Sequence, residues 1–404
     1  MVSRRTFLRQ SSIISFTPLL PAAFANAANF ATPKTDDKVL VVIQLNGGND
    51  GLNTVVPFAD DNYARARKKL RLETKRLHRL DDHSGLHPSM QAAKELYDGD
   101  RMAIVQGVGY PNPDRSHFRS MKIWQTANLD AHSADSHGWL GRTLDQQLAA
   151  SERQQAQMSS RPNAVYVGQQ DVPPALWSRR SEAISLSRLD DLKLAGAVPI
   201  FSSNVSPAKK NELNAFVARQ SLAAFTSAKE LETQLSDKSS SAATYPKTKL
   251  ASRLKLVARM LQSGSPTRIF YTDQSGYDTH STQRYTHSRL LREYSDAVKA
   301  FLDDLKAAKL EDRVVVMAFS EFGRRVFEND SGGTDHGTAG PVFLFGSPVK
   351  GGMCGEAPDL SDLKNGDIKV QTDFRSVYST ILQNWLDVEP GKIIDQSFEQ
   401  LPLF

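Results

Sequence analysis

The chain has 404 residues, of which 40% are hydrophobic, 24% charged and 8% aromatic, the balance of an ordinary globular protein rather than a disordered or fibrous one. Its formal net charge of +5 is too small to indicate a nucleic-acid partner. A single cysteine, Cys354, excludes an internal disulfide and a cysteine-rich metal site.

Residues 1–27 are predicted to be a twin-arginine export signal. Arg4 and Arg5 precede an uncharged run, and residues 25–27 form a small-x-small site where a signal peptidase would cut. The alternative, a basic amphipathic start to a folded domain, is disfavoured because two prolines interrupt any helix there. Cleavage would remove three arginines and no acidic residue, so the net charge would fall from +5 to +2.

We therefore expect the twin-arginine translocase to be a partner during export, and the mature protein to be periplasmic or secreted. This route typically carries chains that have already folded, often around a cofactor. No later segment has the roughly 18 consecutive apolar residues of a membrane span, so no stable span is expected in the mature chain.

A buried strand is predicted over residues 39–45, and it ends in a glycine-rich loop that carries one acidic side chain, Asp50. Residues 101–109 form a second strand of the same kind, which also ends in glycine. Asp50 is either a turn residue or a ligand that the glycine loop delivers to a site.

Ser116 stands where an amphipathic helix is predicted to begin. Serine is a favoured helix N-cap, which is a purely structural role. A hydroxyl at a helix N-terminus also lies in a positive field, beside free N–H groups that hold an oxyanion or a phosphate. Arg115 and Arg119 would add positive charge, so Ser116 is a candidate nucleophile with these two arginines as catalytic partners.

The polar segment from residue 149 to 241 indicates a peripheral elaboration, and residues 236–245 are the most linker-like part of the chain. From residue 246 onward, strands and amphipathic helices alternate. This pattern predicts an α/β fold with a mainly parallel sheet covered by helices on both faces. The expected helices are 246–264, 287–309 and 373–388, and the expected strands are 267–273, 312–323 and 340–346.

Side chains of the kind that bind metals recur at the ends of the predicted strands, where the loops of a parallel sheet converge. Carboxylates and imidazoles without thiolates are the ligands of zinc, manganese, magnesium or calcium, and a metal would offset the cost of burying them. Taken singly, each has a structural reading, such as an ion pair between Glu321 and Arg324 or Arg325. The candidate ligands are Asp50, Asp278, His280, Glu321, Asp335 and His336.

Blocks along most of the chain resemble a known exported family. These blocks include "VVIQLNGGNDGLNTVVP", "VQGVGYPNPDRSHFRSMKIWQTA", "GYDTH", "SEFGRR" and "GGTDHGTAGPVFLFG", between about residues 41 and 382. Together they resemble the family catalogued as domain of unknown function 1501, which is similar in turn to the alkaline phosphatase and sulfatase superfamily. That resemblance implies a three-layer α/β/α, alkaline phosphatase-like fold, which commonly holds two divalent metals.

The same resemblance implies roles for individual residues. Asp50 would correspond to the first aspartate ligand and Ser116 to the nucleophile. Asp278 and His280 resemble an Asp and His ligand pair, although their spacing is tighter than usual. Glu321 would replace the aspartate of an Asp-His-Gly sequence.

Two further positions complete this comparison. His336 resembles the late histidine ligand, with Asp335 either a ligand or a residue that orients it. Phe322 stands where the superfamily places a histidine, which weakens the second metal position. Cys354 does not supply the sulfatase nucleophile signature, which argues against a formylglycine sulfatase.

We therefore expect one alkaline phosphatase-like domain over residues 28–404, with a peripheral insertion around 150–245. The predicted function is an exported metal-dependent hydrolase of small anionic phosphate or sulfate esters, with Ser116 as nucleophile. Asp278, His280 and His336 would hold one metal, and Asp50 and Glu321 the other. The alternatives are a non-catalytic exported binding or assembly protein that retains the fold, and a protein that modifies surface carbohydrates.

Overall fold

The computed structural model describes residues 38–130, 137–153, 164–180, 183–186, 241 and 243–404. All of them belong to one compact unit, residues 36–404. The predicted export signal and most of the predicted insertion lie outside the described residues.

The described part of the chain is built on a nine-stranded sheet in the order β11-β5-β10-β9-β1-β8-β6-β7, with β12 also paired to β5. The strands predicted first and second, β1 and β5, are buried along nearly their whole length, as expected for strands covered on both faces. The bounds are β1 Val39–Asn46, β5 Met102–Gly109, β6 Ala164–Val167, β7 Ala183–Leu186, β8 Ile269–Ser275, β9 Val314–Phe319, β10 Gly340–Phe345, β11 Gly352–Cys354 and β12 Thr372–Asp373.

Strand β1 lies at the middle of the sheet and pairs in parallel with β8 on one side and β9 on the other. The other neighbouring strands are also parallel, except that β10 runs antiparallel to both β5 and β9. The prediction of a mainly parallel sheet is confirmed. The reversal of β10 places its first residue at the edge where the parallel strands end.

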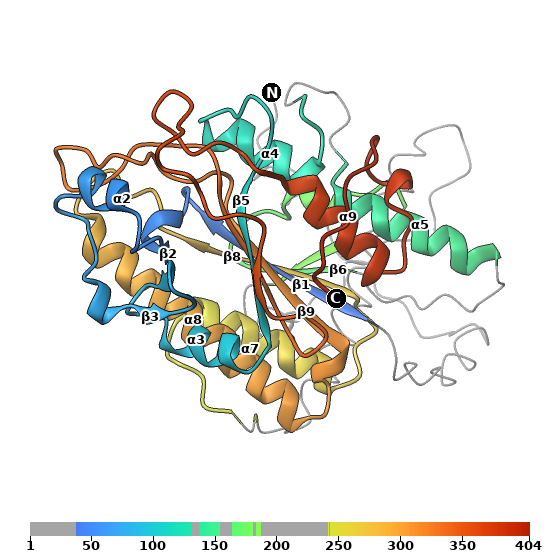
Figure 1. Cartoon of the computed structure of the whole chain (residues 1–404). Helices are drawn as coiled ribbons and strands as arrows, with labels where there is room; N and C mark the ends of the chain where they lie inside the picture. Colours follow the sequence, from blue (N-terminus) through green and yellow to red (C-terminus); the bar gives the residue numbers. More distant parts are fainter. Residues whose placement is uncertain (1–37, 131–136, 154–163, 181–182, 187–240, 242) are drawn as a thin grey trace, which may run out of the picture. The chain divides into compact units, whose positions relative to one another are not determined.

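Helices cover both faces of this sheet (Figure 1). Alternate residues of β1 divide between two cores: Val41 packs in the core that contains Leu254 and Phe301, and Val42 in the core that contains Trp124. The predicted α/β/α arrangement in three layers is therefore confirmed. One face carries α3 Gln91–Asp98, α7 Lys249–Gln262 and α8 Gln283–Ala307, and the other carries α4 His117–Thr126, α5 Trp139–Arg153 and α9 Phe374–Asn384.

Helix α8 begins at Gln283, four residues before the predicted start. Its first turn contains Tyr285, whose side chain is 84% exposed, so the apolar spacing does not extend to the true start of the helix. A tertiary contact compensates, because the side chain of Gln283 is buried and donates to the carboxylate of Asp50.

A smaller layer of structure lies beside the end of β1. Helix α2 and a three-stranded sheet enclose a third cluster of apolar side chains that includes Leu52, Tyr63 and Val326. The elements are α2 Asp61–Ala66, β2 Val55–Val56, β3 His78–Arg79 and β4 Gly85–Leu86. The short 3-10 helices among the described residues are η2 Gly51–Asn53, η3 Thr74–Arg76, η4 Pro174–Leu176, η6 Glu311–Arg313 and η7 Pro390–Lys392.

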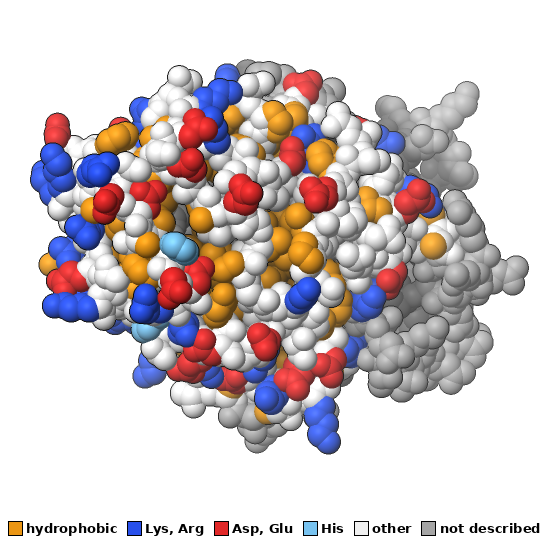
Figure 2. Space-filling model, viewed as in Figure 1, with side chains coloured by type: hydrophobic (Ala, Val, Ile, Leu, Met, Phe, Trp, Pro, Cys, Tyr) orange, Lys and Arg blue, Asp and Glu red, His pale blue; other side chains and the backbone are white. Residues whose placement is uncertain are grey.

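The face shown in Figure 2 carries acidic and basic side chains interspersed with hydrophobic ones. Within the described ranges, no helix combines the length and apolar character that a membrane crossing requires.

Two buried histidines support the loop that follows β1. His287 on α8 lies 2.9 Å from the side-chain oxygen of Asn49, and its ring meets that of His87 edge to face at 5.9 Å. Burial lowers the pKa of His287 to about 4 and that of His87 to about 3, so both rings are neutral in the folded protein near pH 7.

These two groups predict that stability falls in mild acid. Between pH 6.5 and about 4 the unfolded chain binds protons at these rings that the folded chain does not. The contribution of the two histidines to stability is therefore fully present above pH 6.5 and decreases below it. Each histidine should remove about 2 kcal/mol between pH 7 and pH 5, measured by urea unfolding. His87→Leu should reduce this pH dependence, whereas the exposed control His83→Ala should keep it; equal slopes in all three proteins would contradict the assignment.

Candidate metal centre

Five chain segments meet at one edge of the sheet. Three follow the ends of β1, β8 and β9, and a fourth joins the end of β5 to α4. The fifth precedes β10, which reaches this edge with its first residue because it runs antiparallel. Ligand-type residues before one strand and after the others are thus brought to the same place.

Three imidazole rings converge on one carboxylate oxygen at this edge. The Oδ1 atom of Asp278 lies 3.1 Å from Nε2 of His280, 3.1 Å from Nε2 of His336 and 3.5 Å from Nε2 of His117. The two Nε2 atoms of His280 and His336 are 2.9 Å apart. Among the described residues, His117, Asp278 and His336 place their potential ligand atoms within 4.8 Å of one another.

In each of these rings the other nitrogen, Nδ1, lies within hydrogen-bond distance of an acceptor. Nδ1 of His117 is 2.7 Å from Oε1 of Glu321, and Nδ1 of His280 is 3.1 Å from Oδ1 of Asp335. Nδ1 of His336 is 2.8 Å from the carbonyl oxygen of Arg115, which only accepts hydrogen bonds. We therefore assign the proton of each neutral ring to Nδ1, which leaves the lone pair of Nε2 directed at the shared centre.

Lone pairs that face one another across 2.9 Å repel unless a cation lies between them, and His117 Nε2 is a buried atom without a hydrogen-bond partner. Three imidazoles and a carboxylate, with acceptors behind the rings, are the ligands and supporting groups of zinc or a similar divalent metal. The residues present therefore fit a metal.

The charges around the centre also favour a cation. Burial opposes ionisation of Asp278, but the hydrogen bond and the positive charge of Arg324 outweigh it and lower the pKa of this carboxyl to about 2. The hydrogen bond to Glu321 raises the pKa of His117 above its usual value, against the opposing effect of burial. The site thus stabilises positive charge at the position of the imidazoles.

A buried arginine holds this arrangement together. The side chain of Arg324 is fully buried, and its Nη2 atom donates to Oδ1 of Asp278 at 2.7 Å. The same guanidinium donates to the carbonyl groups of Gly47 and Gly48 after β1, Tyr277 after β8 and Thr334 before β10. Sequence analysis considered Arg324 only as an ion-pair partner of Glu321.

His117 is not among the ligands predicted from the sequence, because it lies at the start of a helix and not at the end of a predicted strand. Glu321, predicted as a ligand, instead contacts His117 and also accepts from the N–H of Gly47 at 2.9 Å. The ring of Phe322 lies against both His117 and His336, at 4.9 and 4.8 Å between centroids. Phe322 thus restrains two imidazoles from a position where a third was expected.

Asp50 has different partners. Its carboxylate forms a fully buried ion pair with Arg67, at 2.6 Å, and also accepts from Gln283 and from the N–H of Asn53. Burial raises its pKa, but the Arg67 guanidinium more than offsets this and holds the pKa below its usual value. Asp50 is not a member of the metal-binding group described above, and removing either charge would leave the other unpaired, at a cost of about 3–5 kcal/mol.

The glycines beside Asp50 admit neighbouring loops rather than a ligand. Gly47 has φ +118°, and a Cβ atom there would lie 2.3 Å from the backbone nitrogen of Asp278. Gly48 has φ +74°, and its Cβ would lie 2.4 Å from the ring of Phe322. The glycine loop thus lets Asp278 and Phe322 approach β1 closely.

The predicted catalytic group of α4 lies beside the centre. Ser116 is the N-cap residue of α4, its hydroxyl makes no cap bond to the helix, and its N–H donates to Oδ1 of Asp114 at 2.7 Å. Arg119 pairs with the other oxygen of Asp114 at 3.4 Å. In the sequence, Ser116 lies between two residues of this site. The carbonyl of Arg115 contacts His336, and His117 is one of the three imidazoles.

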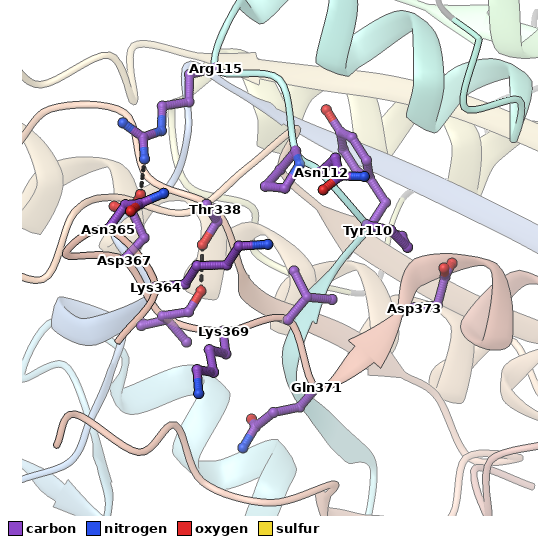
Figure 3. Close-up of a pocket in the computed structure, with 14 residues that line it drawn as sticks. Tyr110, Asn112, Arg115, Thr338, Lys364, Asn365, Asp367, Lys369, Gln371 and Asp373 are labelled. Carbon is purple, nitrogen blue, oxygen red and sulfur yellow. Dashed lines mark hydrogen bonds and ion pairs between the residues drawn. The ribbon is translucent and has the colours of Figure 1, made fainter. Parts of the chain in front are cut away.

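The side chain of Arg115 points away from the cluster of His117, Asp278, His280 and His336, which is called the metal group below. It lines a separate cavity of about 650 Å³ and forms an ion pair with the buried Asp367 (Figure 3). Tyr110 and Lys364 line the same cavity. Only the carbonyl group of Arg115 reaches His336.

A second cavity, of about 690 Å³, opens directly on the metal group. His117, Asp278 and Glu321 form part of its wall, and Phe118 and Met121 of α4 form another part. Arg115, Ser116 and Arg119 do not line it. The cavity supplies space for the organic part of a ligand beside the group that would hold a metal.

A family model described as a protein of unknown function, DUF1501, matches residues 37–388. No curated protein matches the chain. Three of the solved structures that match the chain are the following. A protein in the alkaline phosphatase superfamily from Vibrio parahaemolyticus is 10% identical with a TM-score of 0.41, and the match covers 91% of this chain and 72% of that one.

The C-terminal periplasmic domain of EcEptC from Escherichia coli, in complex with Zn, is 10% identical with a TM-score of 0.36, over 78% of this chain and 75% of that one. The lipoteichoic acid synthase LtaP from Listeria monocytogenes is 8% identical with a TM-score of 0.34, over 72% of this chain and 58% of that one. Similarity at this level says nothing about the substrate of this chain.

The approach of Asp278 to Gly47 can be tested with a matched pair of variants. Gly47→Ala and Gly352→Ala both place alanine at a φ near +117°, but a Cβ at Gly352 meets no atom within 4 Å. Gly352→Ala should cost only about 1–2 kcal/mol of backbone strain. Gly47→Ala must also displace the Asp278 loop, so metal affinity should fall by about tenfold or more, measured by competition with a chelator. Equal metal affinity in the two variants would show that this contact does not position Asp278.

Proposed function

We propose that this chain, which belongs to the DUF1501 family, is an exported metal-dependent hydrolase of phosphate or sulfate esters. The observation that supports this most strongly is the convergence of three Nδ1-anchored imidazoles on Oδ1 of Asp278 at the edge of a cavity of about 690 Å³. A purely structural cluster has no need of open space beside it.

The proposed ligands are His117, His280, His336 and Asp278, around one divalent ion. When bound, such an ion polarises an ester oxygen and makes a nearby hydroxyl or water more acidic. Three imidazoles with one carboxylate suit zinc or manganese better than calcium or magnesium, which prefer oxygen ligands. A second ion held by Asp50 and Glu321 has less support, because Arg67 neutralises the first and His117 and Gly47 engage the second.

The chain's own residues would act as follows. Asp278 is ionised at neutral pH, and Arg324 fixes its position from below. Glu321 orients His117, and Asp335 orients His280. Ser116 remains the proposed nucleophile for two reasons. It lies between His117 and Arg115, whose carbonyl contacts His336, and it stands at a helix N-terminus, where N–H groups stabilise negative charge on an ester oxygen.

Metal analysis tests the centre directly. Purified exported protein should retain about one zinc or manganese ion per chain after exhaustive dialysis. His336→Ala removes one of four proposed ligands, so metal affinity should fall by about tenfold or more and the retained metal should decrease. His83→Ala removes an exposed histidine elsewhere and is the matched control. If the wild type carries no metal and binds none on addition, the hydrolase proposal fails.

The alternative function is a binding or assembly protein without turnover, and one observation favours it: Ser116 does not line the cavity beside the metal group. Ser116→Ala distinguishes the two functions when phosphate and sulfate esters are screened with metal-loaded protein. A hydrolase with a serine nucleophile should lose at least about a hundredfold in kcat while keeping its metal. Turnover that is unaffected by this change would assign the nucleophile to water, and no turnover by the metal-loaded wild type would favour the binding protein.

A further inference from the structure

The cavity beside the metal group has an apolar wall that is unusually exposed. Phe118 on α4 is 89% exposed and Trp177 is 44% exposed, and both line the cavity together with Met121 and Pro174. The indole N–H of Trp177 donates to the carbonyl of Val172 at 2.9 Å, so this ring has a fixed position. Exposed aromatic rings that converge on a cavity mark a binding surface.

Carboxamides provide polar groups in the same cavity. Gln44 at the end of β1 and Gln125 on α4 are more than nine-tenths buried, and Nε2 of Gln125 donates to Oε1 of Gln44 at 2.8 Å. Gln44 donates in turn to Asn46, and Asn46 donates to Ser275 at 3.3 Å. Each carboxamide offers two donor hydrogens and two acceptor lone pairs. The hydroxyl of Tyr271 also donates to Oε1 of Gln44, so the remaining capacity of this pair lies in its N–H groups and in the oxygen of Gln125.

The cavity lining carries no excess of positive charge. Lys122 is its basic residue, and Asp278 and Glu321 are its acidic ones. A second anionic group on the ligand would therefore find little compensation beyond the metal centre. The part of the ligand that fills the cavity is expected to be neutral.

We propose that this cavity binds a pyranose ring, so that the substrates are phosphate or sulfate esters of sugars; this rests on the proposed function. An alkyl or aryl group would leave the remaining donors and acceptors of the carboxamides without partners, which is costly. A sugar ring presents C–H groups on its faces, which pack on Phe118 and Trp177, and hydroxyl groups around its edge, which bond to Gln125, Gln170 and Asn46. A neutral ring of this kind satisfies both walls at once.

Binding of three phosphate monoesters tests the proposal without requiring turnover. Glucose 6-phosphate, phenyl phosphate and octyl phosphate share the anion and differ in the organic group, and inorganic phosphate reports the anion alone. Binding is measured by calorimetry on the full-length exported protein, both metal-loaded and chelator-treated. Glucose 6-phosphate should bind at least about tenfold more tightly than each of the other three.

Variants then identify the wall that provides the preference. Phe118→Ser should weaken binding of glucose 6-phosphate about tenfold. Gln170→Leu should weaken glucose 6-phosphate but not octyl phosphate. Phe327→Ser, which alters another exposed phenylalanine, at 56% exposure and outside the cavity, is the matched control and should change neither.

The outcomes separate this proposal from the hydrolase proposal. Sugar selectivity that persists in chelator-treated protein supports the pyranose site even if no ester is hydrolysed. Phenyl or octyl phosphate binding as tightly as glucose 6-phosphate, or an unchanged affinity in Phe118→Ser, would overturn the pyranose site whatever the metal content.

Discussion

The site depends on one buried guanidinium. Arg324 contacts the loops that follow β1 and β8. Without it, the carbonyl groups of Gly47, Gly48 and Tyr277 would lose this donor. Buried carbonyl groups need hydrogen-bond partners, and a planar group with five donors can serve three loops at once. The same Nη2 group that contacts the carbonyls of Gly47 and Tyr277 also contacts Asp278, so the packing of the loops and the position of the central carboxylate have a single cause.

The three imidazoles of the centre are themselves supported by neighbouring residues. Glu321, Asp335 and the carbonyl of Arg115 hold the rings, and Phe322 packs against two of them. Such contacts fix the orientation of the imidazoles in advance, which would reduce the cost of assembling a metal site there. The aromatic and carboxamide side chains that line the adjacent cavity are also held in position by contacts within the protein.

Hydrophobic patterns were sufficient to predict the sheet, its mainly parallel direction and the layers of helices, because buried strands and amphipathic helices have distinct periods. The resemblance to the family came from short sequence blocks, and the family model that matches residues 37–388 confirms it. Strand ends also led to Asp278, His280 and His336, which the structure brings together. The pairing of Asp50 with Arg67 was beyond reach, because residues 17 positions apart meet there only through tertiary packing.

The pairing of β1 has a consequence for how the protein reaches its native state. Leu40 is paired with Ile269 and Val315, so the first strand of the sheet finds both neighbours only after most of the chain has been synthesised. Such non-local contacts make folding slow and leave a nascent strand with two unpaired edges. If the predicted twin-arginine leader directs export, the chain folds before it is translocated, and this strand has time to find its partners before it crosses the membrane.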